Sequence, residues 1–283
     1  MEKMTPHEIK VFAARIRLET IKETGKRGFG HLGGSLSVVD ALAVLYGGVM
    51  RIDPKNPEWP ERDKLIMSKG HAGPALYAAL ALKGYFPMQW LETLNQPGTR
   101  LPSHCDRRLT PGIDMTTGSL GQGASVACGL ALAQKMDGKG ARTYLFVGDG
   151  ECNEGQVWEA ALFANQQKLD NLTMLVDCNH KQLDGCTQDI IDMGDIAAKL
   201  AGFGWRARSV NGGDTAAIAL AIEAANAVTD RPSCVVLNTI KGAGVPCIEK
   251  IEFNHHIALE GVLLETALME CRETLAKLEG GVL

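Results

Sequence analysis

Asp149 and Asn179 are the residues whose types and spacing point most directly to chemistry. Asp149 lies between two glycines at the end of the apolar run TYLFV, and Asn179 follows the next apolar run, LTMLVDC, thirty residues later. If these runs are neighbouring parallel strands, the carboxylate and amide oxygens meet at one edge of a sheet. Oxygen ligands of this kind suit Mg²⁺ or Ca²⁺, and Mg²⁺ commonly completes its coordination with phosphate oxygens. Gly150, which has no side chain, would let the backbone approach a diphosphate.

The elements that must position these residues are predicted by alternating helix-like and strand-like segments from residue 121 onward. The strand-like segments are continuous apolar runs, which is typical of a parallel sheet covered on both faces. We therefore predict an α/β fold with a parallel sheet covered by helices on both faces. The predicted strands are 143–149, 172–179, 205–211 and 233–240, and the predicted helices are 123–136, 154–169, 195–204, 215–228 and 259–278.

The part of the chain before residue 121 is predicted to be mainly helical. An apolar stripe predicts a helix from about residue 9 to residue 25, the run 35–50 predicts a buried helix, and residues 71–85 predict another. Residues 96–119 predict a loop that is too long to be a simple connection, which makes it a functional candidate. Because no interdomain linker is apparent, residues 1–283 are predicted to form a single domain.

The composition is that of an ordinary globular protein. Of the 283 residues, 45% are hydrophobic and 22% are charged, and the net charge is −4. Lys and Arg are scattered, which argues against a nucleic acid or an anionic membrane as partner. No apolar run is long enough for a membrane span, and the N-terminus has no signal-peptide core. The eight cysteines show no C-x-x-C spacing, which favours a reducing cytoplasm over a zinc or disulfide framework.

The spaced pattern resembles the thiamine-diphosphate-binding motif, in which Gly-Asp-Gly is followed about thirty residues later by Asn. The tripeptide alone is better explained as a tight turn, so the resemblance rests on the whole pattern. Further segments resemble the N-terminal half of the transketolase family, in that family's order. They are GHLGGSLSVVDALAVLY (30–46), SKGHAGPALYAALAL (68–82), LPSHC (101–105), PGIDMTTGSLGQGASVACGLA (111–131) and TIKGAGVP (239–246).

The resemblance implies a set of site residues around thiamine diphosphate and Mg²⁺, with Ca²⁺ or Mn²⁺ as alternative ions. Asp149, Asn179 and the backbone carbonyl of Lys181 would bind the metal. The remaining residues implied at the cofactor are His71, Gly118, Ser119, Leu120, Gly150, Glu154 and His255. The catalytic set implied is His31, His71, His104, His255 and Glu154, where Glu154 and Glu159 belong to an acidic cluster that links paired active sites. Imidazoles suit the proton transfers of this chemistry near neutral pH, and the cofactor supplies the electron sink.

The histidines differ in how closely they match the family pattern. Where the family shows Trp-His-Gly, this chain has Asn254-His255-His256, so either histidine, or neither, occupies the site. The match of His104 depends on one extra residue before Pro-Gly-Ile-Asp. His7 and His180 are interpreted as solvated side chains.

The resemblance also implies a partner, because the family's second thiamine-binding domain, with the glutamate that activates the cofactor, has no counterpart in these 283 residues. The chain is therefore predicted to be the N-terminal subunit of a split transketolase, which transfers a two-carbon ketol unit from a ketose, expected to be a phosphate, to an aldose. We expect activity only with a C-terminal subunit carrying the pyrimidine domain, in an assembly with two copies of each chain. The sugar stays open among pentose phosphates, sulfonated sugars and branched sugars.

Two other functions remain open at this point. One is another thiamine enzyme, such as a deoxyxylulose-phosphate synthase or a 2-oxo-acid dehydrogenase; the segments GHLGGSLS and TTGSLGQG favour transketolase over the dehydrogenase. The other is a non-catalytic module that only binds thiamine diphosphate or a partner. The presence of His31, His71 and His104 together argues against such a module.

Overall fold

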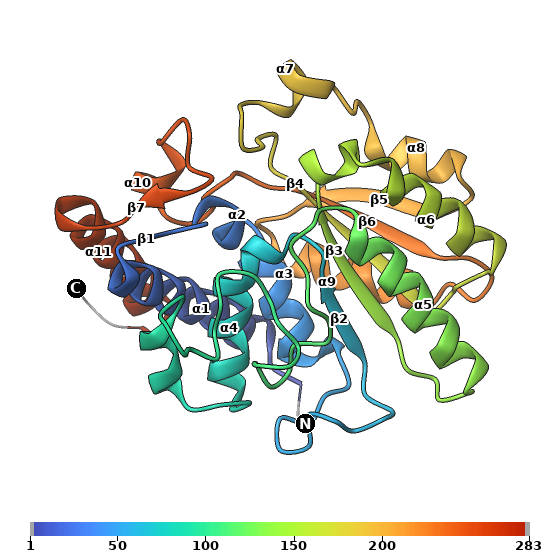
Figure 1. Ribbon diagram of the computed structural model, residues 1–283, viewed down its shortest axis with the longest axis horizontal. Coiled ribbons are helices and arrows are strands. Elements are labelled where there is room, and N and C mark those ends of the chain that lie inside the picture. The colour runs from blue at the N-terminus through green and yellow to red at the C-terminus, as the bar shows by residue number, and fades with distance from the viewer. Residues whose placement is uncertain (1–2, 281–283) are drawn as a thin grey trace.

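A five-stranded parallel sheet forms the centre of the computed structural model, which describes residues 3–280 (Figure 1). The order across the sheet is β2 (Lys64–Met67), β3 (Thr143–Gly148), β4 (Leu172–Cys178), β6 (Ser233–Asn238) and β5 (Arg206–Asn211). All neighbouring pairs are parallel, so the carboxyl ends of the strands lie along one edge. Gly148 of β3 is paired with Asp177 of β4. Asp149 therefore follows this pair by one residue on one chain segment, and Asn179 follows it by two residues on the neighbouring one.

The side chains of each strand alternate between two hydrophobic cores, one on each face of the sheet. Tyr144 and Phe146 belong to the core under α1 (Pro6–Arg27), α3 (Val39–Val44), α4 (Gly73–Lys83) and α9 (Thr215–Asn226). Leu145 and Val147 belong to the core under α5 (Gln122–Met136), α6 (Gly155–Gln166) and α8 (Ile196–Gly202). The predicted α/β fold, a parallel sheet with helices on both faces, is confirmed.

The strand order explains why α9 lies on the opposite face from α6 and α8. From β4 the chain passes through α7 (Thr187–Ile191) and α8 to β5 at the edge of the sheet, and then returns through α9 to β6. Crossovers between parallel strands are right-handed, so a connection that reverses direction across the sheet must place its helix on the other face.

Two predictions about individual elements are wrong. The run 35–50 is not one buried helix, because it divides into the end of α2 (Gly33–Leu36), α3 and a π-helical turn, η1 (Leu45–Val49). Gly48 has a φ of 151°, a conformation that favours glycine, and regular helix ends before it. Strand β5 is not an apolar run, because its polar sequence, RARSVN, forms the exposed edge of the sheet, and only Ala207 and Val210 pack against the cores on its two faces.

A third hydrophobic cluster attaches the C-terminal part of the chain to α1. It joins α1 and α2 to α10 (Pro246–Glu249) and α11 (Gly261–Leu278). Next to it, β1 (Phe29–Gly30) pairs antiparallel with β7 (Ile257–Ala258), which brings the segment after Gly30 beside the segment before Ile257. Short 3₁₀ turns, η2 (Gly70–Ala72), η3 (Met88–Thr93) and η4 (Gly150–Asn153), complete the elements.

Residues 96–119 form a loop without helix or strand, as predicted. Among residues 3–280, no helix combines the length and the apolar character that crossing a membrane requires.

Candidate active site

The carboxyl edge of the sheet opens into a cavity of about 400 Å³. Nearly all the site residues predicted from the sequence line it, although they come from segments far apart in the chain. They are His31, His71, His104, Gly118, Leu120, Asp149, Gly150, Glu154, Asn179, Lys181 and His255. Two predicted residues lie elsewhere: Ser119 is exposed and does not line the cavity, and Glu159 is exposed on α6.

Four imidazoles gather in this cavity around His31. Its ring centroid lies 5.5 Å from that of His71, 5.2 Å from that of His104 and 5.3 Å from that of His255. His71 sits in η2, His104 in the long loop, and His31 and His255 in the segments aligned by the β1–β7 pair. His256 does not line the cavity, and its ring packs against Phe29 at 5.5 Å and against His31 at 4.7 Å. Of the two adjacent histidines, His255 is therefore the one that faces the cavity.

The imidazoles of the cluster favour their neutral form. Burial, followed by the charges of His256 and His104, lowers the pKa of His31 to about 4. Burial and the neighbouring Lys241 lower the pKa of His255 to about 3. The pKa of His71 also lies well below its ordinary value, because the ring is buried and Lys69 is close. Near neutral pH each ring therefore has one nitrogen that accepts a hydrogen bond and one that donates.

Lys241 links this cluster to the end of β4. Its Nζ lies 3.1 Å from His255 Nδ1 and donates to the backbone carbonyls of Lys181, at 3.0 Å, and Gln182, at 3.3 Å. Because an ammonium group only donates, Nδ1 of His255 accepts and the ring proton is on Nε2. Burial, followed by the charge of Lys69, lowers the pKa of Lys241 to about 8.

Asp149 is buried at the end of β3, where backbone groups orient its carboxylate. Oδ1 accepts the N–H of Gly150 at 3.0 Å, and Oδ2 accepts the N–H of His180 at 2.7 Å. Burial and the nearby charge of Asp177 raise the pKa of Asp149. A cation beside this carboxylate would offset both effects.

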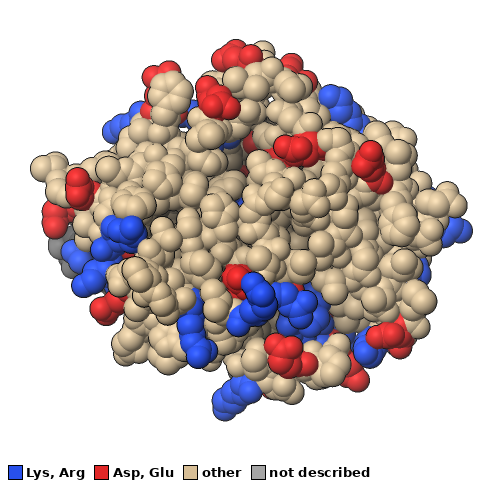
Figure 2. Space-filling view, in the orientation of Figure 1, with Lys and Arg blue, Asp and Glu red and all other residues tan. Residues whose placement is uncertain are grey.

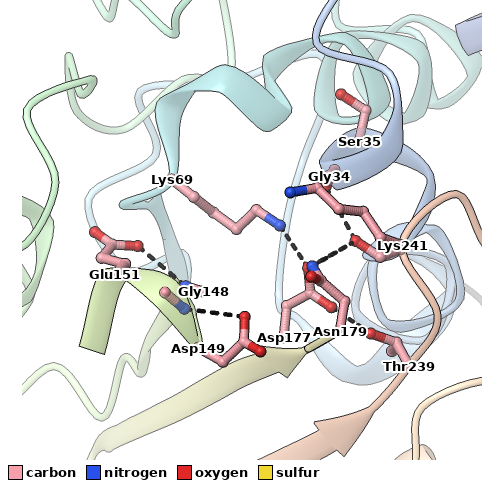
Figure 3. Close-up of polar contacts among 12 residues, drawn as sticks. Gly34, Ser35, Lys69, Gly148, Asp149, Glu151, Asp177, Asn179, Thr239 and Lys241 are labelled. Atoms are coloured by element: carbon pink, nitrogen blue, oxygen red, sulfur yellow. Dashed lines mark hydrogen bonds and ion pairs between the residues drawn. The ribbon is translucent and has the colours of Figure 1, made fainter. Parts of the chain in front are cut away.

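Asp177 fixes the orientation of Asn179 (Figure 3). The amide Nδ2 of Asn179 donates to Asp177 Oδ2 at 2.8 Å, which leaves its Oδ1 as the acceptor, here of the Lys181 N–H at 3.1 Å. Lys69 also donates to Asp177 Oδ2, and Thr239 donates to Oδ1. Burial alone would raise the pKa of Asp177, but the Lys69 ammonium and these hydrogen bonds outweigh burial and hold the pKa below its ordinary value.

Glu151 joins the two glycine-rich segments of the site. Its Oε1 accepts the N–H of Gly121 at 2.8 Å, its Oε2 accepts the N–H of Gly148 at 3.1 Å, and Ser68 Oγ donates to Oε1. One buried carboxylate thus ties the turn before α5 to the end of β3.

Comparison with known proteins identifies the family. The family described as "Transketolase, thiamine diphosphate binding domain" matches residues 9–269. The chain belongs to the transketolase family. The crystal structure of transketolase from Campylobacter jejuni superposes with a TM-score of 0.86 at 28% identity, over 96% of this chain and 45% of that one. The chain thus spans about half the length of the transketolases of known structure that it matches.

Other transketolase relatives match this chain along almost their whole length. The chain is 52% identical to the 6-deoxy-6-sulfo-D-fructose transketolase subunit SqwG of Clostridium sp., over 90% of this chain and 93% of the relative. It is 40% identical to an apulose-4-phosphate transketolase subunit of Actinobacillus succinogenes, over 94% of this chain and 96% of the relative.

The residues at the cavity fit the cofactor of the transketolase family. Asp149 and Asn179 present oxygens to the cavity, and the Lys181 carbonyl keeps a second lone pair beside the hydrogen bond from Lys241. Gly118, with a φ of 156°, leaves open the space where a Cβ would lie 3.2 Å from His104 Cδ2. The site therefore offers oxygen ligands for a divalent metal and room beside the backbone.

Sequence reasoning missed four polar residues of the candidate active site: Lys69, Glu151, Asp177 and Lys241. Lys69 and Lys241 lie within the family-like segments SKGHAG and TIKGAGVP, so a signal was present without an assigned role. Asp177 and Glu151 carry no such signal, because their partners come from distant segments and only the fold brings them together.

Proposed function

We propose that this chain is the N-terminal subunit of a two-subunit transketolase. With thiamine diphosphate and Mg²⁺, the enzyme transfers a two-carbon ketol unit to an aldose acceptor from a ketose that carries a phosphate or sulfonate. One observation carries the proposal: the imidazoles of His31, His71, His104 and His255 face the same cavity as the oxygen ligands at the ends of β3 and β4. Similarity to subunits named for a sulfosugar and for apulose-4-phosphate supports an anionic sugar substrate.

The metal end of the cavity would hold the diphosphate. Asp149, Asn179 and the Lys181 carbonyl would bind Mg²⁺, or Ca²⁺ or Mn²⁺ in its place. Lys69 and Lys241, which both line the cavity, supply positive charge for the phosphate oxygens. Gly118, Leu120 and Gly150 would contact the cofactor, and Ser119 would do so through its backbone. When bound, thiamine diphosphate supplies the electron sink that cleavage of a carbon–carbon bond next to a carbonyl requires.

The imidazoles would orient the sugar and move protons at its hydroxyl and carbonyl oxygens. Neutral rings suit this task, because each can accept a proton at one nitrogen while it donates a hydrogen bond from the other. His71 is the ring nearest Gly34 and Lys69, where the diphosphate would lie, so we place it at the phosphate. His31, His104 and His255 would face the sugar.

Self-association would use the outer faces of α5 and α6. Ser125, Gly129 and Ala133 form an exposed line of small residues on α5, and Leu162 and Phe163 are exposed on α6. Figure 2 shows few charged side chains in the middle of this side of the molecule and more around its rim. Glu154, at the start of α6, would link two active sites across such an interface, in an assembly with two copies of each chain.

A catalytically silent thiamine-diphosphate-binding module is the second candidate, and the clustered imidazoles argue against it. A module that only holds the cofactor has no need of three neutral rings beyond the one nearest the phosphate position. A synthase-like thiamine enzyme is distinguished from transketolase by its substrates and products.

Mixing the purified chain with a C-terminal transketolase subunit tests the proposal. We expect no ketol transfer by the chain alone with saturating thiamine diphosphate and Mg²⁺, and ketol transfer from sugar phosphates or sulfonates after mixing. His31→Ala should lower kcat on the order of 10²–10⁴-fold in the mixture, whereas His7→Ala, at an exposed position of α1, should leave it unchanged. Activity without a partner would overturn the two-subunit proposal. Cofactor binding without turnover in the mixture would favour the silent module.

A further inference from the structure

Asp149, Cys178 and His180 bring three metal-binding atoms together at the ends of β3 and β4. A carboxylate oxygen, the thiol sulfur and a ring nitrogen all lie within 4.8 Å of one another. The Cys178 Sγ is 4.0 Å from each nitrogen of the His180 ring. Cys178 and His180 do not line the cavity, so this cluster adjoins the candidate active site and shares only Asp149 with it.

The backbone around Asn179 places Cys178 and His180 beside Asp149. Asn179, between them, lines the cavity, whereas Cys178 packs at the edge of the core under α5 and α6. His180 has a φ of 61°, uncommon for a residue with a side chain, and its N–H donates to Asp149 Oδ2 at 2.7 Å. The His180 ring is exposed and the thiol is half-buried, so an ion from solvent can reach both.

We propose that Asp149, Cys178 and His180 bind a divalent transition-metal ion of the zinc type. Sulfur and imidazole ligands select such ions, whereas Mg²⁺ prefers oxygen ligands alone. On binding, the Cys178 thiol releases its proton to water and the S–H bond is replaced by a sulfur–metal bond, while water completes the coordination.

Sharing of Asp149 has a consequence that rests on the proposed function. The carboxylate that would hold Mg²⁺ for the diphosphate is also a ligand of the zinc-type site, so the two ions would compete for its oxygens. Zinc-type ions would therefore inhibit cofactor loading in competition with Mg²⁺. In the sequence this site shows only as the tripeptide Cys178-Asn179-His180, because Asp149 joins it from a neighbouring strand.

Cobalt(II) is the spectroscopic probe for the zinc-type site. Titration of the full chain with Co²⁺ should produce a near-ultraviolet sulfur-to-cobalt absorption band, which Zn²⁺ then abolishes by displacement. Cys178→Ser should remove the band and weaken Co²⁺ binding at least about 10–100-fold, the loss that removing even outer partners of a metal site causes. Cys186→Ser, the control at a nearby exposed thiol, should keep the band.

His180→Asn is a second ligand variant, which tests the site even if Cys178→Ser fails to fold. The side chain is exposed, and asparagine tolerates the left-handed backbone at this position, so the fold should be retained while Co²⁺ binding weakens. Absence of a cobalt–sulfur band in the unmodified chain would overturn the site. A band that survives Cys178→Ser, or that is lost in Cys186→Ser, would overturn it equally.

Competition with Mg²⁺ tests the shared carboxylate. Saturating Mg²⁺ together with thiamine diphosphate should weaken the cobalt–sulfur band, and a band that persists unchanged would overturn the competition for Asp149. The band reports on the metal site alone. A chain that shows the expected band but no ketol transfer with its partner would therefore count against the proposed function and not against the zinc-type site.

Discussion

Glu23, on α1, is a buried carboxyl group that lacks the hydrogen bonds made by the carboxyl groups of the candidate active site. Only 2% of the residue is exposed, and neither carboxylate oxygen has a hydrogen-bond partner among residues 3–280. Burial, followed by the charge of Glu19, raises the pKa of Glu23 well above its ordinary value. The folded protein therefore holds this proton more tightly than the unfolded chain does, and stability is lost as pH rises from the unfolded pKa through the folded pKa.

Glu23→Gln should raise the free energy of unfolding near neutral pH. Glutamine cannot ionise, so it removes a cost that grows by about 1.4 kcal/mol for each pH unit between the unfolded and the folded pKa of Glu23. The gain should be larger at about pH 8 than at about pH 5, because Glu23 keeps its proton more fully at the lower pH. Urea unfolding at both pH values measures the effect, with Glu265→Gln, at an exposed position of α11, as the control. An equal gain at the two pH values would show that ionisation of Glu23 does not limit stability.

At the residue scale, the sequence predicted the side chains that line the cavity better than the buried side chains that orient them. The spacing of Asp149 and Asn179 was sufficient to predict that they lie close together, because the carboxyl ends of neighbouring parallel strands meet at the same end of the sheet. Asp177 was not predictable, because its partners Lys69, Ser37 and Thr239 lie in three separate segments that only tertiary structure assembles.

At the scale of elements, Glu151 connects the start of α5 to β3, so both glycine-rich segments depend on one carboxylate. Glu151→Ala removes the acceptor of the Gly121 and Gly148 N–H groups and leaves Ser68 without its partner. We expect a loss of about 2–4 kcal/mol of stability, since several buried groups lose a partner at once. Thermal unfolding measures this loss, and Glu265→Gln is again the control.

Thiamine diphosphate affinity should fall in Glu151→Ala as well, since the segment Gly118–Leu120 precedes the turn that Glu151 holds. Calorimetry with Mg²⁺ and the proposed partner subunit measures the affinity. Unchanged affinity in a destabilised variant would mean that Glu151 supports the fold without positioning the cofactor segment.

The elements themselves were predicted where composition was unambiguous. Strands β3, β4 and β6 are apolar and buried, and their predicted ranges, 143–149, 172–179 and 233–240, contain the observed strands. The run 35–50 was wrongly predicted as one helix, because its apolar residues indicate burial but do not show where the helix ends. The backbone conformation of Gly48 ends the regular helix. Strand β5 lies at the edge of the sheet, where most of its side chains are exposed or half-buried, so its sequence can be polar.

At the scale of the whole molecule, two large cores on opposite faces of the sheet hold the strands, and the third cluster holds the segment that carries His255. The imidazole cluster therefore depends on contacts between the first thirty residues and the last third of the chain, through the β1–β7 pair. Sequence order alone does not reveal this proximity. It was inferred from the family resemblance, and the antiparallel pair supplies its physical cause.

The amino ends of the parallel strands lie away from the cavity, so a reporter group can be inserted there. The turn from α5 to β3 lies at the amino ends of the strands, opposite the cavity, and side chains added at Gly138 or Gly140 would meet open space. A flexible epitope or dye-binding tag of about ten residues inserted at Lys139 should change Tm by only a few degrees, because lengthening an exposed loop has a small entropic effect. The same insertion after Ser119 should abolish thiamine diphosphate binding. If both insertions left thiamine diphosphate binding intact, the carboxyl ends of the strands would not be the binding end of the sheet. With the first insertion in place, fluorescence from the tag could follow assembly with the proposed partner subunit without disturbing the candidate active site at the opposite ends of the strands.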